Sequence, residues 1–424
     1  LGGTCGTNVT WSLKDGIMTI SGNGAMDDFI IVRDWYTGQL IEEETHRSPW
    51  EDYNAQIREV YVEDGVTSVG SIAFCDCYNL EKAVLGNSVK KIGNGAFAND
   101  ENLTELSLGK SVESIGDNAF YGIGVKTLVL PSSLKTINYY GLQALQKLEN
   151  FVTENGGTYQ AVEGVLYTAD GTALVAYPCS RNGEYRIPAG VTKIERNAFY
   201  QTSLSRIVIP DSVTEIGESA FDYSDDLKEI VFGKGAKVIP RSCCYYDRAL
   251  TTVIIPEGVT EVKGGFLRWN TGLESVKLPT TLIGTLPKHS ITDNKVLKTL
   301  TIPHQVTEID SKAFEATTGL ETVYVPSTIT DITPITNNST KANIIYYHTP
   351  TEGEKGRYPE IFGEGNEVCI GKYEFGNVGG TKKEYFESHN SSIINREHSV
   401  IDLRTMDSNY QIKLICMAAF SRSR

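Results

Sequence analysis

A nine-residue signature, V-x-x-I-x-x-x-A-F, returns along the chain every 22 to 24 residues and strongly limits the folds it can adopt. Clear copies begin at Val66, Val89, Val112, Val191, Val213 and Val306, and weaker ones at Leu134, Ala236, Val259 and Leu282. A fixed period of this length is typical of stacked coils, each too small to bury its apolar face alone. We therefore expect a solenoid whose 424 residues need not form several globular domains, because such an array grows in one dimension.

One coil illustrates the expected path of the chain. Leu106 and Leu108 alternate with polar neighbours, which predicts a short strand with both leucines pointing inward. A second short strand is expected at Val112–Ile115, followed by Ala119-Phe120, where alanine permits close packing and phenylalanine fills the space between strand layers. Proline follows the first strand in many coils and predicts a corner, because it cannot continue a ladder of hydrogen bonds. These prolines are Pro131, Pro210, Pro256, Pro279, Pro303 and Pro326.

The coils together predict a mainly β fold with a parallel sheet of about eleven strands, roughly 50 Å long at ~4.8 Å per strand. The expected inward pairs are Val60/Val62, Ala83/Leu85, Leu106/Leu108, Leu128/Leu130, Phe151/Thr153, Ile207/Ile209, Ile230/Phe232, Val253/Ile255, Val276/Leu278, Leu300/Ile302 and Val323/Val325. The sequence offers no helical pattern of ten or more residues inside a coil.

The interruptions and ends of the repeat suggest a division of the chain. Residues 1–56 contain a predicted β-hairpin at Val9–Gly24 and are expected to cap a solenoid over 57–349. A second β-hairpin, turning at Asp170-Gly171, is expected in an insertion over 154–187. A closing strand is expected at Ile344–Tyr347, and residues 350–424 form a segment of unknown fold.

Composition excludes several classes of partner. The net charge of −14 is spread through the repeats, which argues against nucleic acid or an anionic membrane surface. No apolar run reaches 18 residues, so we expect no membrane insertion within this chain.

The usual signatures of catalysis and metal binding are missing from the sequence. The histidines (His46, His289, His304, His348, His389 and His398) show no metal-binding spacing, and we expect surface positions for them. Acidic runs at Asp27-Asp28, Glu42–Glu44 and Asp225-Asp226 are interpreted as solvated loops. We therefore predict no catalytic residues, no metal and no cofactor.

Two cysteine pairs could in principle carry redox or metal chemistry. Cys77 lies three residues after the repeat phenylalanine, and we interpret it as a core residue beside Cys75. Cys243-Cys244 occupy the Ala-Phe slot of their coil and are also expected in the core, with a vicinal disulfide as the alternative.

The combined pattern resembles a known family. The run L-x-x-[IV]-x-[IL]-P followed by V-T-x-I-G-x-x-A-F, from Ile57 to Tyr347, is similar to the BspA-like leucine-rich-repeat family. Both predicted hairpins look like this family as well. The resemblance implies a curved solenoid, a secreted or cell-surface protein of a host-associated microbe, and adhesion without catalytic residues. The weaker coils and the last 75 residues depart from the family pattern.

The outward position between each inward pair suggests where a partner could bind. It carries mostly β-branched or aromatic residues, which either reflect plain β-propensity or form an apolar stripe able to bind a partner. The candidate binding residues are Tyr61, Val84, Val129, Val152, Val208, Val231, Ile254, Lys277 and Tyr324, and Ser107 and Thr301 complete the column.

Three functions are compatible with these observations. The favoured one is a recognition module that binds an extracellular protein or glycoprotein by its sheet face. The alternatives are a structural spacer that presents another module, and an enzyme or carbohydrate-binding module with its site in the insertion or the C-terminal segment. The sequence leaves the oligomeric state open.

Overall fold

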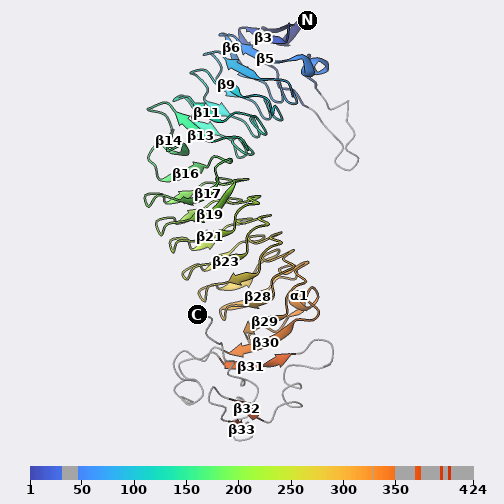
Figure 1. Cartoon of the computed structure of the whole chain (residues 1–424), viewed down its shortest axis with the longest axis vertical. Coiled ribbons are helices and arrows are strands. Elements are labelled where there is room, and N and C mark those ends of the chain that lie inside the picture. The colour runs from blue at the N-terminus through green and yellow to red at the C-terminus, as the bar shows by residue number, and fades with distance from the viewer. Residues whose placement is uncertain (31–45, 327, 349–367, 374–391, 395–399, 403–424) are drawn as a thin grey trace. The chain divides into compact units, whose positions relative to one another are not determined.

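A computed structural model describes residues 1–30, 46–326, 328–348, 368–373, 392–394 and 400–402 (Figure 1). The chain divides into two compact units: unit 1 comprises Leu1–Ser205 with Ile216–Asp226, and unit 2 comprises Arg206–Glu215 with Leu227–Arg424. Short strands follow one another coil after coil in both units, and the described helices are a six-residue 3₁₀ helix, η2 (Glu51–Gln56), and the four-residue α1 (Thr333–Thr336). The predicted mainly β, parallel solenoid is confirmed.

Unit 1 begins with the predicted hairpin cap. Strands β2 (Val9–Lys14) and β3 (Ile17–Gly22) pair antiparallel across Asp15-Gly16, where both residues have positive φ. A strand that the sequence did not predict, β1 (Gly2–Gly6), pairs with β2. β3 then pairs parallel with β5, the first repeat strand, so the cap covers the end of the sheet.

The coils of unit 1 contribute strands to two walls. The broad wall holds β5 (Glu59–Val62), β7 (Lys82–Leu85), β9 (Glu105–Ser107), β11 (Thr127–Leu130) and β13 (Asn150–Thr153). The second wall holds β4 (Gly24–Ala25), β6 (Val66–Val69), β8 (Lys91–Ile92), β10 (Ser114–Ile115) and β12 (Thr136–Ile137). The single continuous sheet expected for the broad wall is not observed, because β11 and β13 pair only with each other.

The insertion adds a three-stranded antiparallel sheet to unit 1. Strands β15 (Val165–Thr168) and β16 (Ala173–Ala176) form the predicted hairpin, and β14 (Tyr159–Val162), which was not predicted, pairs with β15. β16 also pairs parallel with β18 (Lys193–Ile194), so it takes the place of a second-wall strand. The chain passes through β17 (Gly183–Arg186) before the repeat resumes.

Unit 2 continues the same design. Its broad wall runs through β19 (Leu204–Val208), β21 (Glu229–Val231), β23 (Thr252–Ile254), β25 (Ser275–Lys277), β27 (Thr299–Thr301), β29 (Thr322–Pro326) and β30 (Asn343–His348). Its second wall holds β22 (Val238–Ile239), β24 (Glu261–Val262), β26 (Gly284–Leu286) and β28 (Val306–Ile309). The preceding strand, β20 (Glu215–Ile216), instead lies next to β18 in the sheet that contains the inserted strands. β30 is the predicted closing strand, and α1 replaces the Ala-Phe slot in its coil.

Three short strands are described after the repeats. β31 (Val368–Tyr373) pairs antiparallel with β30, and β32 (Ser392–Ile394) pairs antiparallel with β33 (Val400–Asp402). The proposed boundaries at 56/57 and 349/350 remain predictions.

The predicted proline corners are tight turns. Each proline carbonyl accepts a hydrogen bond from the backbone N–H three residues later, over 3.0 to 3.3 Å. The donors are Leu134, Val213, Val259, Leu282, Val306 and Ile329, the first residue of each following signature. Proline therefore ends one wall and positions the next apolar residue, whose side chain enters the core.

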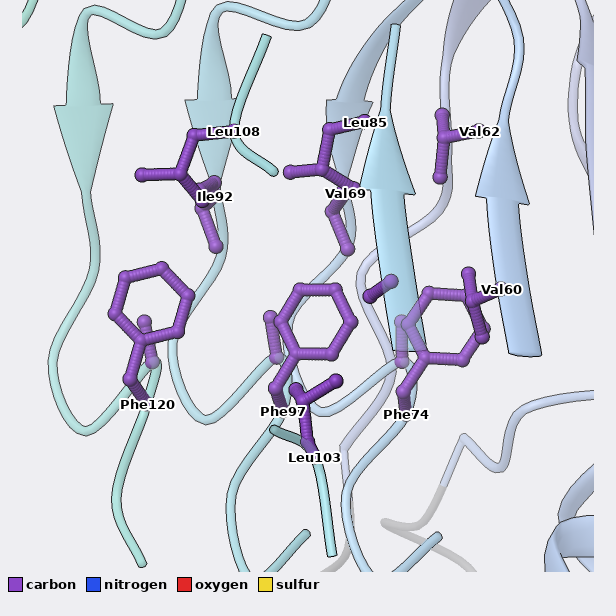
Figure 2. Close-up of a cluster of buried hydrophobic side chains, with 14 of the residues drawn as sticks. Val60, Val62, Val69, Phe74, Leu85, Ile92, Phe97, Leu103, Leu108 and Phe120 are labelled. Carbon is purple, nitrogen blue, oxygen red and sulfur yellow. The ribbon is translucent and has the colours of Figure 1, made fainter. Parts of the chain in front are cut away.

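The signature phenylalanines stack through the core of unit 1 (Figure 2). Ring centroids are separated by 5.5 Å between Trp50 and Phe74, 5.3 Å between Phe74 and Phe97, and 6.3 Å between Phe97 and Phe120. All four rings are fully buried, and the alanines that precede the phenylalanines are buried too. Each coil thus covers one face of its neighbour's ring, which explains why the signature must repeat.

Polar residues are also buried at one repeat position, three residues after the Phe slot. They are Asp100, Thr202, Ser224, Asp247, Asn270, Asn294 and Thr317. The Asn270 side chain accepts a hydrogen bond from the Asp247 backbone N–H and donates one to the Cys244 carbonyl, both over 2.8 Å. Asp100 likewise accepts from the Cys77 N–H over 2.8 Å. This buried polar column satisfies backbone groups of the preceding coil where the turn leaves them without ladder partners.

The glycine that follows the signature isoleucine allows successive coils to approach closely. A Cβ atom on Gly93 would lie 2.4 Å from the Ser71 backbone nitrogen, and one on Gly116 would lie 2.7 Å from the Asn94 backbone nitrogen. Real Cβ atoms do not approach backbone that closely, so the coils would have to move apart.

Replacing Gly93 by alanine should therefore lower the free energy of unfolding by about 1–3 kcal/mol through overpacking. Gly190 is the matched control, because a Cβ atom there would meet nothing within 4 Å apart from its two chain neighbours, and its φ is not positive. Chemical denaturation of both variants checks this, and equal stabilities for Gly93→Ala and Gly190→Ala would contradict the steric explanation.

Candidate binding surface

The outward positions of the broad wall lie beside one another in register. In unit 1, Tyr61 pairs with Val84 and Val84 with Ser107, while Val129 pairs with Val152 on the separate sheet. In unit 2, the pairs run from Val208 through Val231 and Ile254 to Lys277, and Thr301 pairs with Tyr324. We call this set the outward column. Its members are neighbours because equivalent positions of successive coils pair in register on adjacent parallel strands.

The outward column is accessible to solvent, whereas the inward residues on either side of each member along its strand are mostly buried. Val129, Val152 and Ile254 are 46%, 44% and 54% exposed, which is high for large apolar side chains inside strands. Lys277 and Ser107 are also exposed, and the remaining members are half-buried: Tyr61, Val84, Val208, Val231, Thr301 and Tyr324. The predicted inward residues are buried except Leu106 and Thr153, which are half-buried. The Thr153 hydroxyl instead accepts a hydrogen bond from the Ala161 N–H of the insertion.

Charged pairs run beside the outward column. Lys82 contacts Glu105 over 3.3 Å, and Arg206 contacts Glu229 over 2.6 Å, in both cases between registered residues of adjacent strands. One position earlier, ion pairs join Arg58 to Glu81, Lys126 to Glu149 and Lys298 to Glu321. Such exposed pairs contribute little stability, about 0–1 kcal/mol each. They do give the face a pattern of charge that a partner could match.

Tyr61 is tied to this charged row. Its hydroxyl donates a hydrogen bond to the Glu59 carboxylate over 2.7 Å. That hydrogen bond raises the pKa of Tyr61, so its hydroxyl remains a donor at neutral pH. The ring is thereby oriented on the sheet face beside Val84.

Most of the described cysteines are core residues, and Cys75 is half-buried. Cys77, Cys243 and Cys244 are buried, and none of the six cysteines whose side chains the structure describes forms a disulfide, so the alternative of a vicinal disulfide is not realised. Burial raises the pKa of Cys5, Cys75 and Cys179 to about 12. These thiols are therefore protonated at neutral pH and are poor nucleophiles. The side chains of Cys369 and Cys416 lie outside the described residues.

The acidic runs have different environments. Asp225 and Asp226 are exposed as expected. Asp28 instead accepts hydrogen bonds from the Ser71 N–H and hydroxyl over 2.7 and 2.8 Å, and these hydrogen bonds lower its pKa. Glu42–Glu44, His389 and His398 lie outside the described residues. Within the described ranges, no three His, Cys, Asp or Glu side chains gather in a group able to hold a metal ion.

One group of surface residues in unit 2 was missed at the sequence level. Tyr245, Tyr246 and Trp269 form a chain of rings with centroids 6.0 and 5.8 Å apart. Arg248 lies 4.4 Å from the Tyr246 ring centroid, and Arg268 lies 6.0 Å from that of Tyr245. All five residues follow the Phe slot of their coil. Tyr246 and Trp269 both lie two residues after that slot, and both have positive φ. Aligning the coils beyond the signature would have shown this clustering.

Two solved structures with TM-scores above 0.5 support the assignment of the fold. A leucine-rich repeat protein from Eubacterium ventriosum is 27% identical over 78% of this chain and 96% of its own, with a TM-score of 0.57. The pneumococcal vaccine antigen PcpA is 17% identical over 76% and 93% of the two chains, with a TM-score of 0.55. A leucine-rich cell surface protein from Faecalibacterium prausnitzii is 20% identical over 84% and 97%, with a TM-score of 0.42. A comparison with curated sequences gives no match.

A family model gives the decisive match. The BspA-type leucine-rich repeat region matches residues 53–159, 177–270 and 266–343, and the gap between the first two ranges falls within the insertion. These ranges cover well over half of the chain and contain every copy of the signature. The protein therefore belongs to the BspA-type leucine-rich-repeat family.

Proposed function

We propose that this protein is a secreted or cell-surface recognition module that binds an extracellular protein or glycoprotein through its outward column, without catalysis. The observation that carries the proposal is the registered run Val208–Val231–Ile254 in unit 2, where β-branched side chains face solvent on three adjacent strands. Strands of a solvated sheet face commonly carry polar residues there, so an apolar run in register favours a partner surface.

The surroundings of the run also fit recognition. Arg206 and Glu229 provide charges beside Val208 and Val231. One face therefore offers an apolar contact together with charged groups that could orient a partner. Family membership supports an exported location. Among the described residues, no helix is long and apolar enough to cross a lipid bilayer.

The test uses the full chain against an array of purified extracellular-matrix and cell-surface proteins. The combined variant Val208→Lys, Val231→Lys and Ile254→Lys should bind any captured partner at least about tenfold more weakly, a loss of about 1.4 kcal/mol. The reason is that three lysines would be desolvated at the centre of the contact.

A matched control introduces the same three charges outside the outward column. Val238, Ile283 and Val296 are exposed at 37%, 51% and 40%, and their replacement by lysine should leave binding unchanged. Equal binding by the wild type and both triple variants would exclude this face as the site. Loss of binding in both triple variants would point to the change in net charge as the cause. If the array captures no partner at all, the spacer function is favoured instead.

A further inference from the structure

A cleft of about 350 Å³ opens in unit 1 where the insertion interrupts the second wall. It lies between β12, the last strand of its sheet, and β14, the edge strand of the inserted sheet. Ile137, Leu142, Val175 and Ala176 give it apolar lining. In other coils the next coil covers this position, so the cleft is a direct result of the insertion. Its size falls at the lower end of small-molecule sites, about 300–1,000 Å³.

Two buried polar atoms of the lining residues have no partner. Gln143 is 8% exposed, and its Nε2 makes no hydrogen bond. The Asn197 Oδ1 is likewise buried and unpartnered, while the Asn197 Nδ2 donates to the Tyr139 carbonyl over 3.0 Å. The lining residues therefore hold one unpaired donor and one unpaired acceptor, both covered by surrounding protein atoms, although buried polar atoms are normally paired. A ligand hydroxyl group, which both donates and accepts, would pair with either atom once the side chains that cover it shift on binding.

The aromatic lining is held in place. Arg196 stacks over Tyr139, 4.0 Å from its ring centroid, and donates to Glu218 over 2.7 Å. Tyr139 also packs edge-on against Tyr140, with centroids 4.1 Å apart. Burial raises the pKa of Tyr139 to about 12, so its phenol remains neutral. The ring thus forms a fixed wall at the mouth of the cleft, where it is 37% exposed.

The charges around the cleft are already paired within the protein. Glu195 contacts Lys193 over 3.2 Å, and Arg196 is paired with Glu218. An anionic or cationic ligand would have to break one of these pairs. The remaining polar lining consists of amides and hydroxyls, from Asn138, Thr158, Tyr159 and Thr168. The complementary ligand is small, uncharged and rich in hydroxyl groups, with an apolar face.

We propose that this cleft binds one neutral sugar residue of a saccharide, with Gln143 and Asn197 bonding its hydroxyls and the apolar lining contacting the C–H face of its ring. The site is independent of the outward column. It would allow unit 1 to recognise a glycan while the broad wall contacts a protein.

Saturation-transfer NMR on the full chain tests the proposal. The probes are the methyl glycosides of glucose, galactose, mannose and N-acetylglucosamine, with N-acetyl-leucine amide as a non-sugar control. At least one glycoside should receive saturation, and the amide should not. Gln143→Leu keeps the side-chain volume but removes the hydrogen-bond donor, and Tyr139→Ala removes the aromatic ring at the mouth of the cleft. Each substitution should raise the dissociation constant of the glycoside at least fivefold.

Three further variants make the result specific. Tyr121 is 39% exposed in unit 1 but does not line the cleft, so Tyr121→Ala should bind the glycoside like the wild type. The outward-column triple variant should also retain glycoside binding, which separates this proposal from the preceding one. If Gln143→Leu fails to fold, Asn197→Ala and Tyr139→Ala carry the test. Saturation of no glycoside, or equal affinity in the wild type and the cleft variants, would overturn the proposal.

Discussion

Replacing Phe97 by alanine should lower the free energy of unfolding of unit 1 by about 3–5 kcal/mol. The Phe97 ring is fully buried between Phe74 and Phe120, so truncation removes contacts with both neighbouring coils and leaves a cavity. Backbone hydrogen bonds join each coil to the next, and the gap cannot close without disturbing them. Urea denaturation monitored by circular dichroism measures the loss.

Two variants show whether the loss comes from the cavity. Phe97→Leu fills most of the space and should cost less than half as much as alanine. Tyr121→Ala removes an exposed ring from the next coil and should change stability by no more than about 0.5 kcal/mol. If Phe97→Ala were as stable as Tyr121→Ala, the stacked rings would not be the main support of the core.

The second large effect is expected at Asn270, where aspartate should cost about 3–5 kcal/mol at neutral pH. Both side-chain atoms of Asn270 are used, and the residue is fully buried. Aspartate keeps the acceptor for the Asp247 N–H but places a second carboxylate oxygen against the Cys244 carbonyl. The variant therefore loses a donor and buries a charge. Thermal and urea denaturation across pH measure both effects.

The pH dependence of this variant has a definite sign. Burial disfavours the charged form and raises the folded-state pKa of the new carboxyl above its unfolded value. The folded state then binds more protons than the unfolded state between these two values, so the stability deficit shrinks as pH falls through that window. A deficit that is constant from pH 8 to pH 4 would show that the charge is not its cause.

Asp100 provides the reciprocal experiment at the same repeat position. Burial raises its pKa well above the usual range, and its Oδ2 has no hydrogen-bond partner. Asp100→Asn should therefore stabilise unit 1 at neutral pH, with a gain that diminishes on acidification for the same linkage reason. Destabilisation by this substitution would mean that the carboxylate has a partner that asparagine cannot replace.

The fold could be predicted well from the sequence because each position of the repeat is seen in several copies, which agree with one another. Pro131 and Pro210 mark corners that the structure shows as tight turns, and Phe97 lies in the core because its equivalents recur at the same position. The N-terminal and inserted hairpins followed from Asp15-Gly16 and Asp170-Gly171, whose turn chemistry is local.

Other features depended on contacts that no local pattern reports. Asp100 and Asn270 resemble ordinary loop residues in sequence, yet their hydrogen bonds reach a neighbouring coil and bury them. β14 was missed because its residues pair only after the insertion folds back on itself. The cleft beside Gln143 forms because no regular coil packs against β12 at the insertion. This gap follows from the positions of the strands in space and not from a local sequence pattern.

The outward column remains a prediction, although its register and exposure are now defined. β-propensity alone explains half-buried residues such as Val84 and Val231. It explains less well why Ile254, the registered neighbour of Val231, is more than half exposed.

The coil-to-coil hydrogen bonding also determines how the protein would respond to force. Because each coil bonds mainly to the coils before and after it, tension on the chain ends would detach coils in succession rather than all at once. Each detached coil of 22 to 24 residues would release roughly 80 Å of extended chain. A molecule anchored at one end and held by a partner at the other would lengthen stepwise, dissipating load before the contact itself was broken.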